Sequence, residues 1–310
     1  MYSAIAFLLT SFSLASATVL PRAAPVKLAV NPVCGSFAGS PASVRGTLPP
    51  LSSFSNIVTF GDSYTDGGKH NGSALSPPVL TKPNPSAGGR YTNGPVWAEY
   101  LAEAAGAKLM DYAVTGAVVD NGQWPTVDST TPNDLLTQAN NFIGQFNKLD
   151  ATKTLYVLFF GIQDYVLSLN NGNSSLSNQA ENIAWAILEL ESSPQFGKNF
   201  LIIDNHGRGT ESPSGAAFKT ELFQALGYLQ GIGLNVGYVD LSTVWNGVLG
   251  NSPGAAAFGY TSTGACLASS TSTAGSCADP DHAFYWFPGN PTTATHKIIS
   301  DYIQAVWAQC

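Results

Sequence analysis

Short apolar runs alternate with amphipathic helical patterns along most of this chain, and this alternation restricts the fold more than any other feature. The apolar runs are too short for helices and are bounded by Gly, Asp or Asn, as buried strands are. They are Asn56–Phe60, Lys108–Ala113, Thr154–Phe160, Asn199–Ile203 and Asn235–Asp240. Strands separated by helices pair in parallel, so the pattern predicts a parallel sheet with helices on both faces and functional sites at the carboxyl ends of the strands.

The predicted helices lie between these strands. Apolar residues recur at helical spacing after Pro132, Ser177 and Ser214. A last helix is predicted to begin at Asn290-Pro291, because Asn is a favourable N-cap and Pro fits the first helical position. The sequence shows no internal repeat and no sign of a second domain, so we expect one domain over residues 53–310.

Composition and charge exclude several classes of partner. Hydrophobic residues make up 44% of the 310 residues, enough for a sizeable core, whereas charged residues make up only 11%. The net charge of −7 would repel nucleic acid or an anionic membrane, and no basic stripe counters it. Without a Cys-x-x-Cys spacing or a Gly-rich phosphate fingerprint after the first strand, we expect no metal, nucleotide or other cofactor. The expected state is a monomer.

The first residues predict secretion. An apolar stretch too short to span a bilayer is followed by the small-residue site Ala15-Ser16-Ala17, so residues 1–17 are predicted to be a signal peptide, although no Lys or Arg precedes the apolar stretch. Residues 18–52 are rich in Pro, Ser and Gly and are predicted to form an extended leader on the surface. No later apolar run approaches the ~20 residues of a spanning helix, so an extracellular location is expected.

The four cysteines suit an oxidising compartment, and four cysteines allow three pairings. Cys266 and Cys277 bracket a flexible loop, which predicts a local disulfide. Cys34 and Cys310 would then join the two ends of the chain. Asn71 and Asn173 each begin a glycosylation sequon.

The segment Val58–Asp66 carries the strongest chemical signal, because Ser63 directly follows a predicted buried strand. A serine at the start of a helix there has its hydroxyl near helix-start amides. The Ser63 N–H can then bind an oxyanion that develops as the hydroxyl attacks a carbonyl. For an isolated Gly-Asp-Ser, however, a simple helix N-cap is the more common role.

The chain from about Ile57 to its end resembles the GDSL (SGNH) ester hydrolases, in particular the fungal acetylesterase-like members of carbohydrate esterase family 16. Three blocks, beginning at Gly61, Gly89 and Asp111, occur in the family's order. The resemblance implies a flavodoxin-like three-layer α/β/α sandwich with a mainly five-stranded parallel sheet. It also implies Ser63 as nucleophile, a Gly116 N–H in the oxyanion hole, and short acyl esters of carbohydrates as substrates.

Two further blocks depart from the family pattern. Gln163 stands where the resemblance implies an oxyanion asparagine, which places the amide one methylene further out. In the last block, aligned on Trp286 and Pro291, Phe287 replaces the aspartate and Asn290 replaces the catalytic histidine. An asparagine cannot accept the serine proton, and systems without one triad member keep only about 10³–10⁴-fold catalysis over water.

Two other histidines are candidate substitute bases. His282 completes a literal Asp-x-x-His with Asp279, upstream of the aligned block. His206 follows the fourth predicted strand and should lie at the same sheet edge as Ser63, although a solvated loop histidine is the more common case. His296 is expected to be structural and His70 exposed.

Two functions from different classes therefore remain. The first is a secreted ester hydrolase with a degenerate catalytic block. The second is a catalytically impaired member that acts as an extracellular carbohydrate-binding or surface protein. Five aromatic residues are candidates to line its cleft, although such residues are more often core: Tyr64, Tyr91, Trp97, Trp124 and Trp286.

Overall fold

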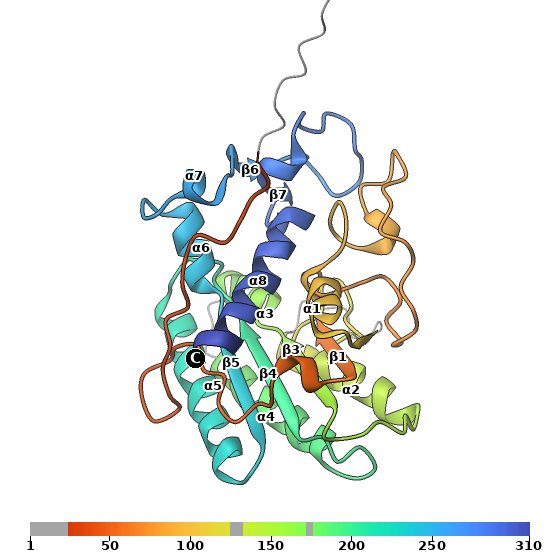
Figure 1. Ribbon diagram of the computed structural model, residues 1–310, viewed down its shortest axis with the longest axis vertical. Helices are drawn as coiled ribbons and strands as arrows, with labels where there is room; N and C mark the ends of the chain where they lie inside the picture. Colours follow the sequence, from red (N-terminus) through yellow and green to blue (C-terminus); the bar gives the residue numbers. More distant parts are fainter. Residues whose placement is uncertain (1–23, 125–132, 172–175) are drawn as a thin grey trace, which may run out of the picture.

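The computed structural model (Figure 1) describes residues 24–124, 133–171 and 176–310. The predicted signal peptide, the first residues of the predicted leader and the sequon at Asn173 lie outside the described residues.

A five-stranded parallel sheet forms the centre of the molecule, in the strand order β2-β1-β3-β4-β5. Every pair of neighbouring strands runs parallel. The strands are β1 (Asn56–Gly61), β2 (Lys108–Asp111), β3 (Thr154–Phe159), β4 (Asn199–Asp204) and β5 (Asn235–Asp240). All five predicted strands are confirmed.

Helices cover both faces of the sheet, as the alternation predicts (Figure 1). One face packs against α2 (Leu135–Gly144), α4 (Leu176–Glu191) and α5 (Pro213–Gly231). The other face packs against α1 (Trp97–Ala105), α6 (Ser242–Leu249) and α8 (Thr293–Gln309). Along β1, Val58 and Phe60 enter the first core and Ile57 enters the second, because successive side chains of a strand point to opposite faces. The expected three-layer α/β/α sandwich is confirmed.

The remaining elements lie around the edges of the sandwich. They are α3 (Ile162–Asn171), α7 (Ala255–Phe258), the small sheet β6 (Ser262–Ala265), β7 (Ala283–Phe287) and β8 (Asn290–Pro291), and the 3₁₀ turns Leu51–Ser53, Ala87–Gly89, Asn121–Gln123 and Pro280–His282.

The predicted start of the last helix at Asn290-Pro291 is wrong. Helix α8 begins at Thr293, and its N-cap is Thr292, whose hydroxyl accepts a hydrogen bond from the Thr295 N–H. The chain turns at Gly289, where φ is 78°, and Asn290 returns as β8 to pair with Phe287. Asn290 therefore does not cap the helix, and its side chain is available for other contacts.

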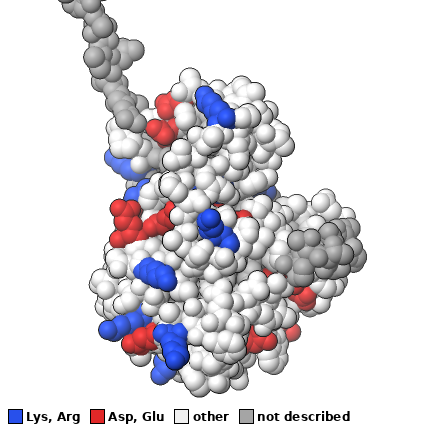
Figure 2. All heavy atoms as spheres, turned by 90° about the vertical axis from the view of Figure 1, so that its right-hand side faces the viewer, with Lys and Arg blue, Asp and Glu red and all other residues white. Residues whose placement is uncertain are grey.

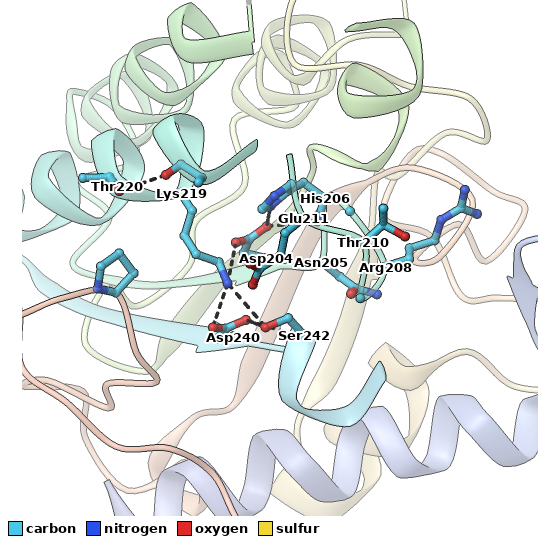
Figure 3. Close-up of a pocket in the computed structure, with 14 residues that line it drawn as sticks. Asp204, Asn205, His206, Arg208, Thr210, Glu211, Lys219, Thr220, Asp240 and Ser242 are labelled. Carbon is cyan, nitrogen blue, oxygen red and sulfur yellow. Dashed lines mark hydrogen bonds and ion pairs between the residues drawn. The ribbon is translucent and has the colours of Figure 1, made fainter. Parts of the chain in front are cut away.

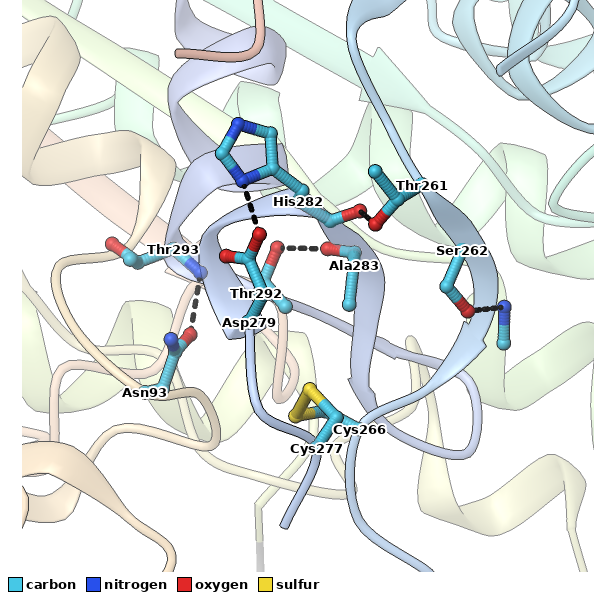
Figure 4. The surroundings of a disulfide bond; sticks show 11 residues. Asn93, Thr261, Ser262, Cys266, Cys277, Asp279, His282, Ala283, Thr292 and Thr293 are labelled. Carbon is cyan, nitrogen blue, oxygen red and sulfur yellow. Dashed lines mark hydrogen bonds and ion pairs between the residues drawn. A yellow bond between two sulfur atoms is a disulfide. The ribbon is translucent and has the colours of Figure 1, made fainter. Parts of the chain in front are cut away.

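The leader crosses the surface and is held at several points (Figure 1). Val44 forms an antiparallel bridge with Tyr238 of β5 at the edge of the sheet. The structure contains both expected disulfides, Cys34–Cys310 between the chain ends and the local bridge Cys266–Cys277 (Figure 4).

On the face shown in Figure 2, charges of both signs are interspersed among mostly uncharged residues. Within the described ranges, no helix has the length and apolar character needed to cross a bilayer.

Candidate active site

The strand order brings the loops after β2, β1 and β3 together at the carboxyl edge of the sheet. Gly61, the last residue of β1, is in register with Phe159 of β3, and its carbonyl accepts a hydrogen bond from the Val114 N–H in the loop after β2. Gly116, Ser63 and Gln163 each follow one of these three strand ends. Ser63 therefore lies in the central loop, between the loops that carry the other two.

Ser63 lies in a single tight turn, not at the start of a helix as the sequence predicted. The N–H groups of Thr65 and Asp66 both bond to the carbonyl of Asp62, at 3.0 Å, and the chain then leaves the helical path. Ser63 keeps 5% of its surface exposed. Its hydroxyl donates a hydrogen bond to Oδ1 of Asn290 at 3.1 Å, across 227 residues of sequence.

The N–H groups of Ser63 and Gly116, both at this edge, have no acceptor within the described part of the chain. Gly116 is exposed and has φ 81°, a conformation that favours glycine. Its loop is held by Asp66, whose carboxylate accepts from the N–H and the hydroxyl of Thr115, each at 2.7 Å. Both amides are thus free to bind an oxyanion of a substrate.

Gln163 lies in the first turn of α3 and is partly exposed. Its side chain makes no hydrogen bond to the described residues, so its amide is free to donate. The neighbouring Asp164 is buried instead and accepts hydrogen bonds from Val119 and Trp124.

The turn that presents Asn290 to Ser63 is clamped from two sides. The Gly289 carbonyl accepts from the Tyr64 hydroxyl at 2.5 Å and from Nη1 of Arg208 at 3.0 Å. The sequence did not predict either of these hydrogen bonds. Arg208 and Gly289, for example, are 81 residues apart, and no local pattern links them.

Phe287 is 1% exposed and lies edge-on to Tyr91, with 4.6 Å between ring centroids. It packs in a small cluster with Cys266, Leu267 and Trp286. An apolar ring here supplies neither a proton acceptor nor a group that could orient one.

His206 does not contact Ser63. Its Nδ1 lies 2.7 Å from Oδ1 of Asp204 (Figure 3), and its ring is packed between Tyr165 and Phe218. Burial opposes the charged imidazolium, but the Asp204 carboxylate outweighs burial and raises the pKa of His206. His206 is 7% exposed, so the expectation of a solvated loop histidine is wrong.

His282 is also engaged away from Ser63. Its Nδ1 lies 2.8 Å from Asp279 (Figure 4), and its Nε2 lies 2.9 Å from the Ala24 carbonyl. The literal Asp-x-x-His therefore forms an ion pair, and both ring nitrogens already have partners.

The last two histidines complete the set of four. His296 is fully buried, and burial lowers its pKa to about 3, which keeps it neutral. His70 is half-exposed and pairs with Asp66 at 3.0 Å. None of the four histidines contacts Ser63 in the described structure, where the partner of the Ser63 hydroxyl is Asn290.

Four of the five aromatic residues considered for a binding cleft belong to the core: Tyr64, Trp97, Trp124 and Trp286. Their polar atoms are satisfied inside the protein: for example, the indole N–H of Trp97 donates to the Thr65 hydroxyl and that of Trp286 donates to the Pro85 carbonyl. Only Tyr91 is partly exposed, so these residues do not form an aromatic cleft.

Buried carboxyl groups near the site predict that the protein is most stable in mild acid. Burial raises the pKa of Asp62 and of Asp111 to about 7 and that of Asp164 to about 6. Between about pH 4 and pH 7 the folded chain therefore binds more protons than the unfolded chain, and the free energy of unfolding falls as pH rises. The raised pKa of His206 acts in the same direction.

Below about pH 4 the free energy of unfolding instead falls as pH falls. Burial raises the pKa of Asp204, but His206 and Lys219 outweigh burial and lower it, so the stability that Asp204 contributes is lost as pH falls below about 4. We expect a melting temperature several degrees higher at pH 5 than at pH 7.5, measured by calorimetry, and a smaller difference in Asp62→Asn. A melting temperature that rises between pH 5 and pH 7.5 would contradict the assignment.

Comparison with known proteins defines the class of this chain. The sequence model of the GDSL-like lipase/acylhydrolase family matches residues 57–303. The match covers most of the chain, including Ser63, Gly116, Gln163 and Asn290. The chain belongs to this family.

Two curated relatives match parts of the chain. An acetylesterase of Hypocrea jecorina is 28% identical over 176 residues, 51% of this chain and 49% of that protein. A thermolabile hemolysin of Vibrio parahaemolyticus is 26% identical over 149 residues, 47% of this chain and 32% of that protein. The chain therefore matches about half of one relative and about a third of the other.

Solved structures resemble the chain more distantly. A carbohydrate esterase family 2 enzyme of Corynascus thermopiles (Myceliophthora fergusii) is 16% identical, with a TM-score of 0.47 over 82% of this chain and 65% of that one. Axe2, an acetylxylan esterase from Geobacillus stearothermophilus, is 16% identical, with a TM-score of 0.44 over 84% and 98%.

Proposed function

We propose that the protein is an extracellular ester hydrolase that acts through Ser63 on short acyl esters of carbohydrates, with slow turnover because Asn290 takes the place of a general base. The observation that carries the proposal is the hydrogen bond from the Ser63 hydroxyl to Oδ1 of Asn290. Disulfides suit a secreted protein, and the predicted signal peptide at residues 1–17 agrees with that location. The relative named acetylesterase supports a short acyl group.

In the proposed reaction the Ser63 oxygen attacks the ester carbonyl carbon. The resulting oxyanion accepts hydrogen bonds from the Ser63 and Gly116 N–H groups, which have no other acceptor in the described structure. The Gln163 amide supplies a third donor. Because Gln is one methylene longer than Asn, some of the 10²–10³-fold effect that such a donor has on kcat is expected to be lost.

The limiting step is removal of the serine proton. An amide oxygen can accept a hydrogen bond but does not take up a proton near neutral pH, so Asn290 orients the hydroxyl without deprotonating it. The proton passes to solvent instead. Collapse of the oxyanion then breaks the bond to the alcohol, which leaves with a proton from solvent, and water hydrolyses the acyl ester of Ser63 to release the acid and restore the hydroxyl. Both the base and its orienting acid are absent, so the oxyanion hole and substrate binding alone are expected to give a rate about 10³–10⁴-fold above water, because triad members act as a unit.

The alternative is a protein that binds acylated carbohydrate without turnover. It is favoured because both the histidine and the aspartate of the family pattern are replaced. Asn290 and the buried Phe287 leave no base and no orienting acid beside Ser63. Hydrolysis at the rate of the uncatalysed reaction would select this alternative.

Ser63→Ala tests the proposal. We expect the purified parent to hydrolyse an aryl acetate slowly but measurably, and Ser63→Ala to lose this rate to the level of buffer. Ser63→Ala removes one hydroxyl from a nearly buried site, so its melting temperature should match that of the parent. Equal rates in parent and variant would show that Ser63 is not the nucleophile.

A further inference from the structure

A hollow on the outer surface of α2 and α4 is separate from the Ser63 site. It has a volume of about 250 Å³, and its lining includes Asp120, Leu136, Asn182, Trp185 and Glu189. Trp185 is 65% exposed, unlike the buried tryptophans of the core. We call these five residues the Trp185 hollow.

The α4 residues of the hollow share one helix face. Asn182, Trp185 and Glu189 follow at spacings of three and four residues, so their side chains lie in one row. Leu136 of α2, 47% exposed, adds a second apolar side chain. The indole is thus bordered by hydrogen-bonding groups on its own helix and by an aliphatic group opposite.

The polar groups of the hollow are partly fixed and partly free. Nδ2 of Asn182 donates to Oδ2 of Asp120 at 3.2 Å, and Asp120 is held by the Gly122 N–H at 2.8 Å. Oδ1 of Asn182 accepts no hydrogen bond from the described residues. The exposed Glu189 carboxylate and this amide oxygen therefore remain available to accept hydrogen bonds from a ligand.

We propose that the Trp185 hollow binds a neutral pyranose unit of a carbohydrate polymer. The C–H face of a pyranose ring is flat and apolar and packs on an indole, which offers large rigid contact area at low entropic cost, while the hydroxyls at its rim donate to carboxylate and amide oxygens. The lining has two carboxylates and no cation, which disfavours an acidic sugar or a phosphate. An apolar ligand would leave these oxygens without partners.

The hollow is connected to the Ser63 site through one loop. Gly116 and Asp120 lie in the same loop after β2, and the Val119 N–H between them donates to Asp164, the residue after Gln163. A polymer held on Trp185 would raise the local concentration of its acylated units near Ser63. The inference rests on the proposed function only for the choice of a carbohydrate polymer.

Affinity electrophoresis through gels with soluble neutral xylan tests the proposal. We expect the parent to be retarded, the dissociation constant to rise about tenfold in Trp185→Ala, and a smaller rise in Trp185→Phe, which keeps a ring. Tyr228→Ala is the matched control, because Tyr228 is an equally exposed aromatic (68%) on α5 outside the hollow and should migrate like the parent.

Several results would overturn the proposal. The first is a parent that migrates without retardation, and the second is equal retardation of the parent and a folded Trp185→Ala. The third such result is stronger retardation by acidic polygalacturonate than by xylan. A parent dimer in sedimentation velocity that Trp185→Ala converts to monomer would assign the hollow to a second copy of the chain instead. Aryl-acetate hydrolysis should be unchanged in Trp185→Ala. If the parent shows no Ser63-dependent hydrolysis, the proposed function fails while the retardation still tests the hollow.

Discussion

The double variant Phe287→Asp/Asn290→His is expected to hydrolyse an aryl acetate about 10²–10⁴-fold faster than the parent, the contribution typical of general-base assistance. Asn290 already contacts the Ser63 hydroxyl, so a histidine there starts within reach of the proton. Phe287 pairs with Asn290 across β7 and β8, and directly opposed side chains lie close enough to interact. The new aspartate can therefore orient the new imidazole.

The single variants separate the two roles. Phe287→Asp alone should not accelerate hydrolysis, because it orients nothing, and it should destabilise the fold by about 3–5 kcal/mol through loss of a buried ring. Asn290→His alone should give a smaller gain than the pair, because its tautomer is not fixed. If the double variant melts cooperatively yet is no faster than the parent, the placement of the base at position 290 is wrong.

Removal of the Cys34–Cys310 disulfide is expected to lower the free energy of unfolding by about 5 kcal/mol, against about 3 kcal/mol for Cys266–Cys277. The first bridge spans 276 residues and the second spans 11, so the first restricts the unfolded chain far more. The leader that carries Cys34 belongs to the folded unit, since Leu48 is buried and Val44 bridges to β5.

The two serine pairs, Cys34→Ser/Cys310→Ser and Cys266→Ser/Cys277→Ser, are each other's control in urea unfolding. An equal or smaller effect of the long-range pair would mean that the leader unfolds independently of the sandwich.

The strands were predictable because each is a continuous apolar run bounded by Gly, Asp or Asn, and burial on both faces of a parallel sheet requires that composition. The start of α8 was not predictable, because Asn290 and Thr292 are both good N-cap residues. Only the turn at Gly289 and the pairing of Asn290 with Phe287 decide between them. Local preference alone does not contain that tertiary contact.

The candidate site shows the same division. Ser63, Gly116 and Gln163 follow predicted strand ends, so sheet topology brings them to one edge. The clamp of Arg208 on the Gly289 carbonyl and the ion pair of His206 with Asp204 depend on side-chain directions after β4. From sequence spacing alone, a histidine after β4 that faces Ser63 cannot be distinguished from one that packs against α5, as His206 does.

Covalent labelling of Ser63 tests the central claim most directly. An alkyl fluorophosphonate forms a stable adduct with a serine whose hydroxyl attacks and whose oxyanion hole is intact. Peptide mass spectrometry is expected to find the adduct on Ser63 of the parent and not in Ser63→Ala, and to find that it forms at least about 100-fold faster in Phe287→Asp/Asn290→His. A folded parent and a folded double variant that both remain unlabelled at Ser63 would contradict the account.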